Sequence, residues 1–525
     1  MKYINTYNTT ADYNNDSARL YPNVSYIKDV KEVKWARTDP TLIVAKFTSS
    51  SNAIVAYKQE LFSSITIDGE EQTIDTGIMR YLFNGGEHEV VYRLVDPTTL
   101  GQQALFSCQG ITSIKIPETV TTIGALAMSS CTGLTSLTIP DSVTTIGDQA
   151  FQGCSGLTSI IIPNSVTSIN YGAFQNCTGL TSVTIPDSVT TINNYAFNGC
   201  KGLTSVVMGN AVTTIRQNAF ADCKHLTNIT IPSSVTILEN SAFSGCNSLT
   251  SVVIDSNSVV AANYRSYNSL YNVFGGQVTS IVIPDSATTI GEWAFRAFKN
   301  LTSFTIPASV TSIGQGALNS SGLTSINIPA SLTSIGNNAF QNCSNVVSVT
   351  VDSGNTAYND GNGSNCIIRT STNALIQGCN NTVIPNTVVT IGAAAFAGCT
   401  GLASVTIPDS VTTIGTQAFA GCTGLTSLTI PNSVTIIGQY AFQACSGLTN
   451  ANIGSGVTDI LNLSFSDCTG LTSFTCNATT PPRLVPNVFQ NVPATCAIYV
   501  PAASVDAYKA ATNWSSRADY IQAIQ

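Results

Sequence analysis

The cysteines are the residues of this chain with the greatest capacity for chemistry, because histidine is almost absent. The chain has 525 residues, of which 16 are cysteine and 2 are histidine, His88 and His225. Two histidines far apart in sequence make most His-based catalytic and metal constellations untenable. Many cysteines indicate disulfides in a secreted protein, and a Cys-x-x-Cys motif indicates zinc or redox chemistry. No Cys-x-x-Cys motif occurs, so zinc is not predicted.

The spacing of the cysteines argues against a disulfide framework. Cysteine recurs with a 23-residue period, at Cys108, Cys131, Cys154, Cys177, Cys200, Cys223 and Cys246, and again at Cys399, Cys422, Cys445 and Cys468. The same position in successive repeats faces the same way, so neighbouring Cβ atoms run parallel instead of pointing at one another. The pattern predicts a ladder of reduced, buried thiols that act as small hydrophobic residues. Four cysteines leave this register and are the candidates for disulfides: Cys366, Cys379, Cys476 and Cys496.

Two longer repeats interrupt the period and carry the candidate ligand-binding residues. The spacing grows to 29 residues between Ile254 and Ile283, and to 33 between Val351 and Ile384. Insertions in a solenoid form loops on one side, often the binding side, and Tyr and Arg are favoured interface anchors. The candidates are Tyr264, Arg265, Tyr267 and Tyr271 in the first longer repeat, and Tyr358 and Asp360 in the second. The alternative is that these repeats bind nothing, and that Tyr271 and Phe274 fill a widened turn.

No catalytic or metal motif is found elsewhere. The segment from Asp360 to Ser364 faintly resembles a calcium loop, but it lacks the terminal bidentate Glu, so no metal is predicted. Acidic residues of the repeats, such as Asp141, Asp187 and Asp409, occupy turn positions that should face solvent. No nucleophile is paired with a base, and no carboxylate pair is formed. The sequence therefore predicts no enzyme and no cofactor.

Charge is scarce and unevenly placed. Lys and Arg number 21 and Asp and Glu 29, for a net charge of −8, and only 10% of residues are charged. An acidic chain without a basic cluster is not expected to bind nucleic acid. No run of 18 apolar residues occurs, so membrane insertion is not predicted, and the first residues lack an apolar leader. Residues 1–104 hold 23 of the 50 charges, which predicts a different kind of structure before the repeats.

The elements that position these side chains recur with the same period as the cysteines. In residues 157–162, Leu157, Ile160 and Ile162 should point inward, and Pro163 should end the strand because it has no N–H. A second short segment, an Ala-Phe pair and the cysteine then close the turn. One turn has too few inward side chains to fold alone, so turns must stack into a solenoid. We predict a curved solenoid with the 157–162 type of strand on its concave face. The phenylalanines should form one buried row: Phe151, Phe174, Phe197, Phe220 and Phe243.

The outward positions of these strands form a nearly uncharged hydroxyl surface. They include Ser136 and Thr138, Ser182 and Thr184, Ser303 and Thr305, Ser404 and Thr406, and Ser427 and Thr429. One interpretation is that Ser and Thr are simply good strand formers on a solvated face. The other is that the surface offers hydrogen bonds to glycans or peptides.

The string of residues 180–200, LTSVTIPDSVTTINNYAFNGC, resembles the BspA-like, or Treponema-type, leucine-rich repeat. The resemblance extends over roughly residues 100–500. It implies a non-enzymatic binding or adhesion protein at a bacterial cell surface or outside the cell, with a protein or glycan ligand on a host or neighbouring cell. Residues 498–514 resemble the closing segment of such proteins from gut Bacteroidetes. They predict a last strand, a short helix that starts at Ser504, and Trp514 shielding the open end of the core.

The resemblances extend to the N-terminal part of the chain. Residues 1–40 resemble short N-terminal segments in structural proteins of gut Bacteroides phages. We expect these residues to form an anchoring arm. The alternative function that this resemblance implies is that of a structural or receptor-recognition protein of a virion. Residues 41–100 resemble a small Ig-like module, with strands expected at 42–47, 65–67 and 89–94 and hairpin turns at Asp68-Gly69 and Gly85-Gly86.

These observations predict a mainly β fold in which a small β-sandwich-like domain precedes a leucine-rich-repeat solenoid. The expected organisation is an arm over 1–40, the small domain over 41–100, the solenoid over 101–475 and a C-terminal cap over 476–525. The longer repeats lie at 255–282 and 352–383 within the solenoid.

Overall fold

The computed structural model describes residues 24–26, 35–37, 41–49, 52–265 and 269–525. It divides into two compact units, which are considered separately. The first comprises residues 1–249 with 273–275, and the second residues 250–272 with 276–525. Near the N-terminus, β1 (Val24–Tyr26) and β2 (Trp35–Arg37) pair antiparallel.

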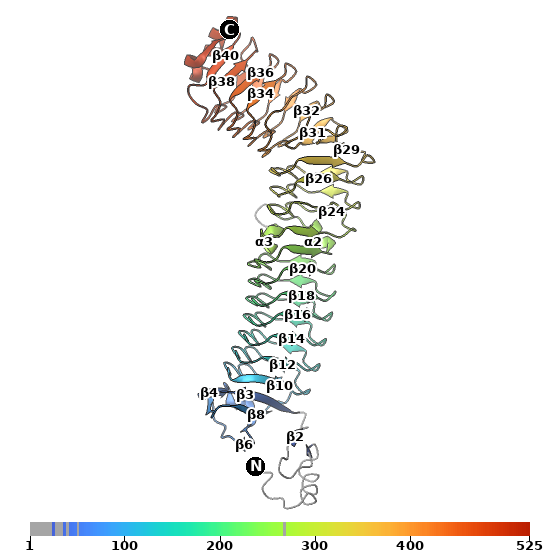
Figure 1. The fold of residues 1–525 in the computed structure, drawn as a ribbon, viewed down its shortest axis with the longest axis vertical. Helices are drawn as coiled ribbons and strands as arrows, with labels where there is room; N and C mark the ends of the chain where they lie inside the picture. The colour runs from blue at the N-terminus through green and yellow to red at the C-terminus, as the bar shows by residue number, and fades with distance from the viewer. Residues whose placement is uncertain (1–23, 27–34, 38–40, 50–51, 266–268) are drawn as a thin grey trace, which may run out of the picture. The chain divides into compact units, whose positions relative to one another are not determined.

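The first unit contains a stack of turns in which each turn contributes two short strands (Figure 1). Parallel pairing joins each residue to its equivalent in the next turn, as in Ser159 with Ser182 and Ser182 with Ser205. Since parallel strands of consecutive turns align without a shift, every inward position meets its own equivalent. The first ladder consists of β14 (Ser159–Ile161), β16 (Ser182–Ile185) and β18 (Ser205–Met208). The second includes β15 (Ser168–Ile169), β17 (Thr191–Ile192), β19 (Thr214–Ile215) and β21 (Ile237–Leu238).

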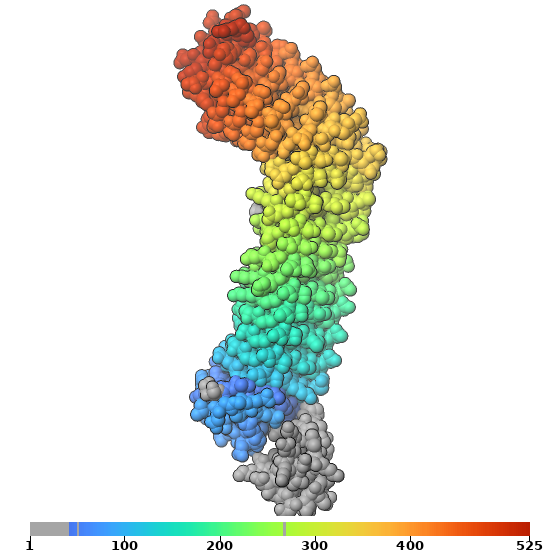
Figure 2. Space-filling view, in the orientation of Figure 1, coloured from blue at the N-terminus to red at the C-terminus, as the bar shows by residue number. Residues whose placement is uncertain are grey.

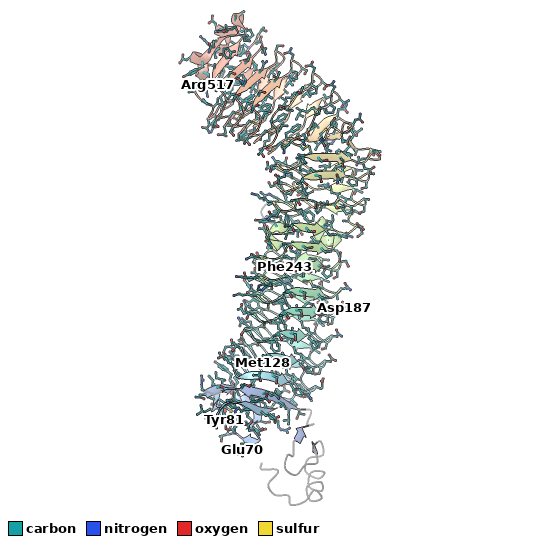
Figure 3. All side chains as sticks on the ribbon, viewed as in Figure 1. Glu70, Tyr81, Met128, Asp187, Phe243 and Arg517 are labelled. Atoms are coloured by element: carbon teal, nitrogen blue, oxygen red, sulfur yellow. The ribbon has the colours of Figure 1, made fainter. Side chains whose placement is uncertain are left out.

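The predicted row of phenylalanines is confirmed. The rings from Phe151 to Phe243 stack with centroid distances of 5.4, 5.2, 5.2 and 5.2 Å and interplanar angles of 9° or less. All five side chains are fully buried. In the space-filling view, neighbouring turns of this unit are packed against one another along the stack (Figure 2). The labelled Asp187, in the turn after β16, lies at the outer edge (Figure 3), where its Oδ1 accepts the Asn210 N–H at 2.7 Å.

The N-terminal strands form where the sequence predicts them, but they do not form a separate sheet. The six-stranded sheet has the order β12-β10-β3-β8-β5-β6, so β3 pairs antiparallel with the first strand of the repeats. Tyr57 and Phe106 pack at 4.9 Å, and the Cys108 thiol donates to the Val55 carbonyl at 3.3 Å. The sheet and core therefore run from these strands into the first turns. The strands are β3 (Leu42–Thr48), β5 (Phe62–Ile67), β6 (Glu70–Glu71), β8 (Glu87–Leu94), β10 (Ile111–Lys115) and β12 (Ser136–Thr138).

One of the two predicted hairpin turns is wrong. Asp68 and Gly69 have φ of 51° and 87° and join β5 to β6, as expected. The turn at Gly85-Gly86 leads from β7 (Met79–Leu82) to β8, but β7 pairs with β4 (Asn52–Ala56) in another sheet. The buried Phe83 lies between these strands and stacks on Phe47 at 5.6 Å. Core packing thus directs the chain from one sheet to the other.

The second unit contains the second longer repeat and all of the first except residues 273–275. In the first, β22 (Ser251–Ile254) pairs parallel with β23 (Ser280–Val282), and α2 (Asn257–Ala261) and α3 (Leu270–Phe274) occupy the extra length between them. The Ser256 hydroxyl caps α2 by accepting the Val259 N–H at 3.1 Å. In the second, β29 (Tyr358–Asn359), β30 (Ile367–Arg369) and β31 (Ala374–Gln377) pair antiparallel, and β30 and β31 form a hairpin.

Regular parallel turns resume after the hairpin. One ladder is β32 (Thr390–Ile391), β33 (Thr413–Ile414), β35 (Ile436–Ile437), β37 (Asp459–Ile460) and β39 (Arg483–Leu484). The other is β34 (Ser427–Ile430), β36 (Asn450–Ile453), β38 (Ser473–Cys476), β40 (Ala497–Val500) and β41 (Ile521–Ala523).

The chain closes with η2 (Ala502–Ser504), α4 (Val505–Ala510) and η3 (Ser515–Tyr520). Trp514 is 0% exposed, and its indole N–H donates to the Pro482 carbonyl at 2.9 Å. Ser504 is the N-cap residue of α4, which confirms the expected start of the helix, and its hydroxyl donates to the Thr479 carbonyl at 2.7 Å. Arg517, labelled in Figure 3, donates to the Pro493 carbonyl at 2.8 Å. The cap is therefore tied to the preceding turns by side-chain bonds.

Candidate functional site

In the first longer repeat, Tyr264 connects two parts of the backbone through hydrogen bonds. Tyr264 is partly buried, and its hydroxyl donates to the Val259 carbonyl in α2 at 3.0 Å. Its backbone N–H donates to the Glu292 carbonyl in the following turn at 2.9 Å. Burial raises the pKa of this phenol well above its usual range. This geometry holds α2 in place and uses the Tyr264 hydroxyl within the fold.

Two other candidates of this repeat are exposed. Arg265 is exposed, and Tyr271 is 38% exposed with its ring edge-on to Phe298 at 5.8 Å. Tyr267 lies outside the described residues. Phe274, in contrast, is fully buried and continues the phenylalanine row at 5.5 Å from Phe243. The widened turn is thus filled by Phe274, and Tyr271 keeps part of its ring at the surface.

The second longer repeat places its two candidates in structural positions. Tyr358 is 2% exposed, and its hydroxyl accepts the Ile335 N–H at 2.9 Å. The Asp360 carboxylate accepts the Gly363 N–H at 3.1 Å, and its carbonyl accepts the Ser364 N–H at 3.0 Å. These bonds close a tight turn within the segment that faintly resembles a calcium loop. Among the described residues, no three His, Cys, Asp or Glu side chains are grouped to hold a metal ion.

The hydroxyl surface of the strands divides into two kinds of position. The Thr directly before a strand donates its hydroxyl to the carbonyl of its equivalent one turn earlier, as Thr135 does to Thr112 at 2.9 Å and Thr204 to Thr181 at 3.0 Å. Their hydroxyl protons are therefore used inside the stack. The outward Ser182 and Thr184 are exposed, in the pattern expected of a solvated strand face.

All 16 cysteines are free and buried, so the predicted ladder of reduced thiols is confirmed. The thiols also make a regular contact that their spacing did not predict. Each of several thiols donates to the carbonyl 26 residues earlier, as Cys154 does to Met128 and Cys200 to Phe174, at 3.2 and 3.1 Å. Burial raises the pKa of the Cys154 and Cys200 thiols to about 12. These groups are thus protonated and unsuited to nucleophilic chemistry.

A surface pair of tyrosines was missed by sequence reasoning. Tyr171 and Tyr195 occupy adjacent turns of the first unit, and their ring centroids lie 5.6 Å apart. The available signal was aromatic residues in two successive repeats, close before the Ala-Phe pair of each. Residues 1–40, on which the expectations of an anchoring arm and a virion protein rest, lie largely outside the described residues.

Stacked 23-residue turns with Leu-x-x-Leu-x-Ile strands define a leucine-rich-repeat protein. A family model described as the BspA type leucine rich repeat region matches residues 76–202, 167–273, 266–377 and 375–494, well over half of the chain. The chain belongs to this family. None of the helices in the described part of the chain has the length and hydropathy needed to cross a bilayer.

Several solved structures are similar to this chain. A leucine-rich repeat protein from Bacteroides ovatus is 27% identical, over 73% of this chain and 88% of its own, with a TM-score of 0.46. A leucine rich cell surface protein from Faecalibacterium prausnitzii is 30% identical, over 63% and 82%, with a TM-score of 0.32. The pneumococcal vaccine antigen PcpA is 17% identical, over 70% and 85%, with a TM-score of 0.36. No curated protein matches the chain significantly.

Proposed function

We propose that this protein is a non-enzymatic binding and adhesion protein that acts at a bacterial surface or outside the cell. It presents its leucine-rich-repeat surface to a protein or glycan on a host or neighbouring cell. Membership of the BspA-type family supports this function. The chemistry of the described residues is consistent with it, because the thiols are buried and protonated.

The observation that carries the proposal is the exposure of Arg265 and Tyr271 on a repeat that departs from the regular period. Interface anchors combine a large contact area with directional bonds, and Tyr and Arg are enriched among them. Regular turns present mostly Ser, Thr and short aliphatic side chains on their strands. The longer repeat therefore supplies anchor types that the regular strand face lacks.

The test is a double variant, Arg265→Ala with Tyr271→Ala, whose binding to fixed epithelial cells is compared with that of the wild-type chain. We expect a loss of affinity of about tenfold or more, as for central anchors, with an unchanged melting temperature. Arg369→Ala, which removes an exposed arginine from the other longer repeat, is the matched control. If the double variant binds like wild type, these residues are not anchors; if the wild-type chain binds no cell, the adhesion proposal is wrong.

A further inference from the structure

Tyr171 and Tyr195 lie in adjacent turns, each shortly before the Ala-Phe pair of its own repeat. We call these two rings the aromatic platform. Tyr171 is 44% exposed, and the planes of the two rings are inclined by 63°. The backbone fixes this arrangement, because the Tyr171 carbonyl accepts the Gln149 N–H at 2.8 Å and the Tyr195 N–H donates to the Gln217 carbonyl at 3.3 Å. A large aromatic ring with a free edge and face costs less entropy to use in binding than a long flexible side chain.

A row of carboxamides runs beside this platform across successive turns. Gln149 donates to Gln152, Gln152 to Gln175, and Gln175 to Asn198, each at 3.1 Å. Asn198 then donates to the Ala221 carbonyl at 3.2 Å. A carboxamide has two N–H donors and two acceptor lone pairs, so Gln152 and Gln175 each retain capacity beyond these bonds. The chain of bonds fixes the orientation of every amide before any ligand arrives.

Gly172 brings the amides next to the platform. Its φ is +55°, and a Cβ at this position would lie 3.1 Å from Cγ of Gln149 and 3.3 Å from Oε1 of Gln175. A side chain at residue 172 would therefore push both glutamines away. Because Gly172 directly follows Tyr171, the absence of a Cβ lets Gln149 and Gln175 approach the backbone next to this tyrosine.

Charge around the platform is sparse. Asp148 lies one repeat before Tyr171, and in the turns after Tyr195 the Arg216 guanidinium forms an ion pair with Glu239 at 2.9 Å. Such a surface offers neither steering nor ion pairing to a polyanion. It does offer rings that can stack on apolar faces, and fixed groups that both donate and accept hydrogen bonds.

We infer that Tyr171, Tyr195 and the amide row from Gln149 to Asn198 bind an uncharged glycan. This inference rests on the proposed binding function and names a ligand class and a surface for it. A pyranose ring has an apolar C–H face, which stacks on an aromatic ring. Its hydroxyls both donate and accept, as carboxamides do. The amide row continues over three turns at a spacing of about 4.8 Å per turn, so it suits a linear chain of several sugars.

The test uses the full chain and three variants, Tyr171→Ala, Tyr195→Ala and Tyr171→Phe. The control is Tyr440→Ala, because Tyr440 has the same place before Ala-Phe as Tyr195 and a similar φ, 56° against 60°, but Thr416 stands in the preceding turn where Tyr171 stands before Tyr195. Binding is measured on immobilised mucin and epithelial cells, untreated, oxidised with periodate or digested with protease. Soluble mannan, xylan and galactan serve as neutral competitors, and heparin as a charged one.

We expect periodate to abolish binding, and a neutral polysaccharide to compete where heparin does not. Tyr171→Ala and Tyr195→Ala should each lower affinity about tenfold or more, with Tyr171→Phe and Tyr440→Ala close to wild type and all melting temperatures similar. Binding that is lost after protease and survives periodate would identify a protein partner, which overturns the glycan inference and leaves the proposed function standing. Periodate-sensitive binding that neither alanine variant weakens would place the glycan elsewhere. Failure of the wild-type chain to bind any target would contradict both.

Discussion

A phenylalanine inside the buried row contributes to two interfaces, because it stacks on the equivalent ring of the turn before and of the turn after. Phe197 lies 5.2 Å from both Phe174 and Phe220. We expect Phe197→Ala to lower the free energy of unfolding by about 3–5 kcal/mol, through the cavity left between two close-packed turns. The control is Ile161→Ala, at a side chain that is 81% exposed, which should change stability by less than about 0.5 kcal/mol. Chemical denaturation of both variants measures the difference, and equal effects would mean that the row is not a core.

The cysteine thiols should be inert in the native protein. Burial raises the pKa of the Cys154 and Cys200 thiols to about 12, so at pH 8 almost no thiolate is present to react. We expect iodoacetamide to leave the cysteines from Cys131 to Cys246 unmodified in the folded chain and to alkylate them fully after denaturation. Mass spectrometry of non-reduced peptides gives the readout. A disulfide between adjacent turns, such as Cys154 with Cys177, would contradict the ladder.

At the scale of elements, Tyr358 joins the second longer repeat to the regular turn before it. Its hydroxyl accepts the buried Ile335 N–H at 2.9 Å. Tyr358→Phe keeps the ring but leaves this N–H without its partner, and we expect a loss of about 1–3 kcal/mol in the free energy of unfolding. Tyr271→Phe, in the other longer repeat, should be close to neutral because Tyr271 is partly exposed. Thermal melting of the two variants compares them, and a neutral Tyr358→Phe would mean that water replaces the lost acceptor.

The elements differ in how far the sequence could predict them. Turns that recur with a fixed period were predictable, because many copies show which positions alternate between inside and outside. Each longer repeat occurs only once, so no further copies show which of its positions face inward. Tyrosine suits both an interface and a core, so the type of Tyr264 or Tyr358 could not show that its hydroxyl brings together two parts of the backbone. The Gly85-Gly86 turn was misread because pairing of β7 depends on the distant β4. Conversely, the Tyr171 platform needs two turns in register, which becomes visible only in three dimensions.

At the scale of the whole molecule, the buried thiols predict a dependence of stability on pH. In the folded chain, the pKa of a buried thiol such as Cys200 is raised to about 12. In the unfolded chain, a thiol has a pKa of about 8.5. The contribution of this thiol to stability is fully present below the pKa of the unfolded thiol. It is lost as the pH rises toward the pKa of the folded thiol. Each such thiol contributes a slope of about 1.4 kcal/mol per pH unit in this window.

The first unit holds six buried thiols with a raised pKa, from Cys108 to Cys223. We therefore expect its melting temperature to be nearly constant from pH 6 to 8 and to fall steeply above about pH 9. Melting curves at constant ionic strength test this, with a Cys154→Ala, Cys177→Ala variant as the comparison that should show a shallower fall. A flat profile up to pH 10 would contradict the burial of the thiols.

The parallel pairing of equivalent residues also decides how a unit responds to force. Hydrogen bonds between turns, such as Thr144 N–H to the Thr121 carbonyl at 2.9 Å, run along the direction of stacking. When a unit is pulled from its two ends, these bonds bear the load in series, so only the weakest junction has to open at a time. Each released turn yields about 70–80 Å of extended chain. A cell tethered through such a stack would feel a series of small, equal extensions under flow, and the attachment would lengthen many times over before its ligand is torn away.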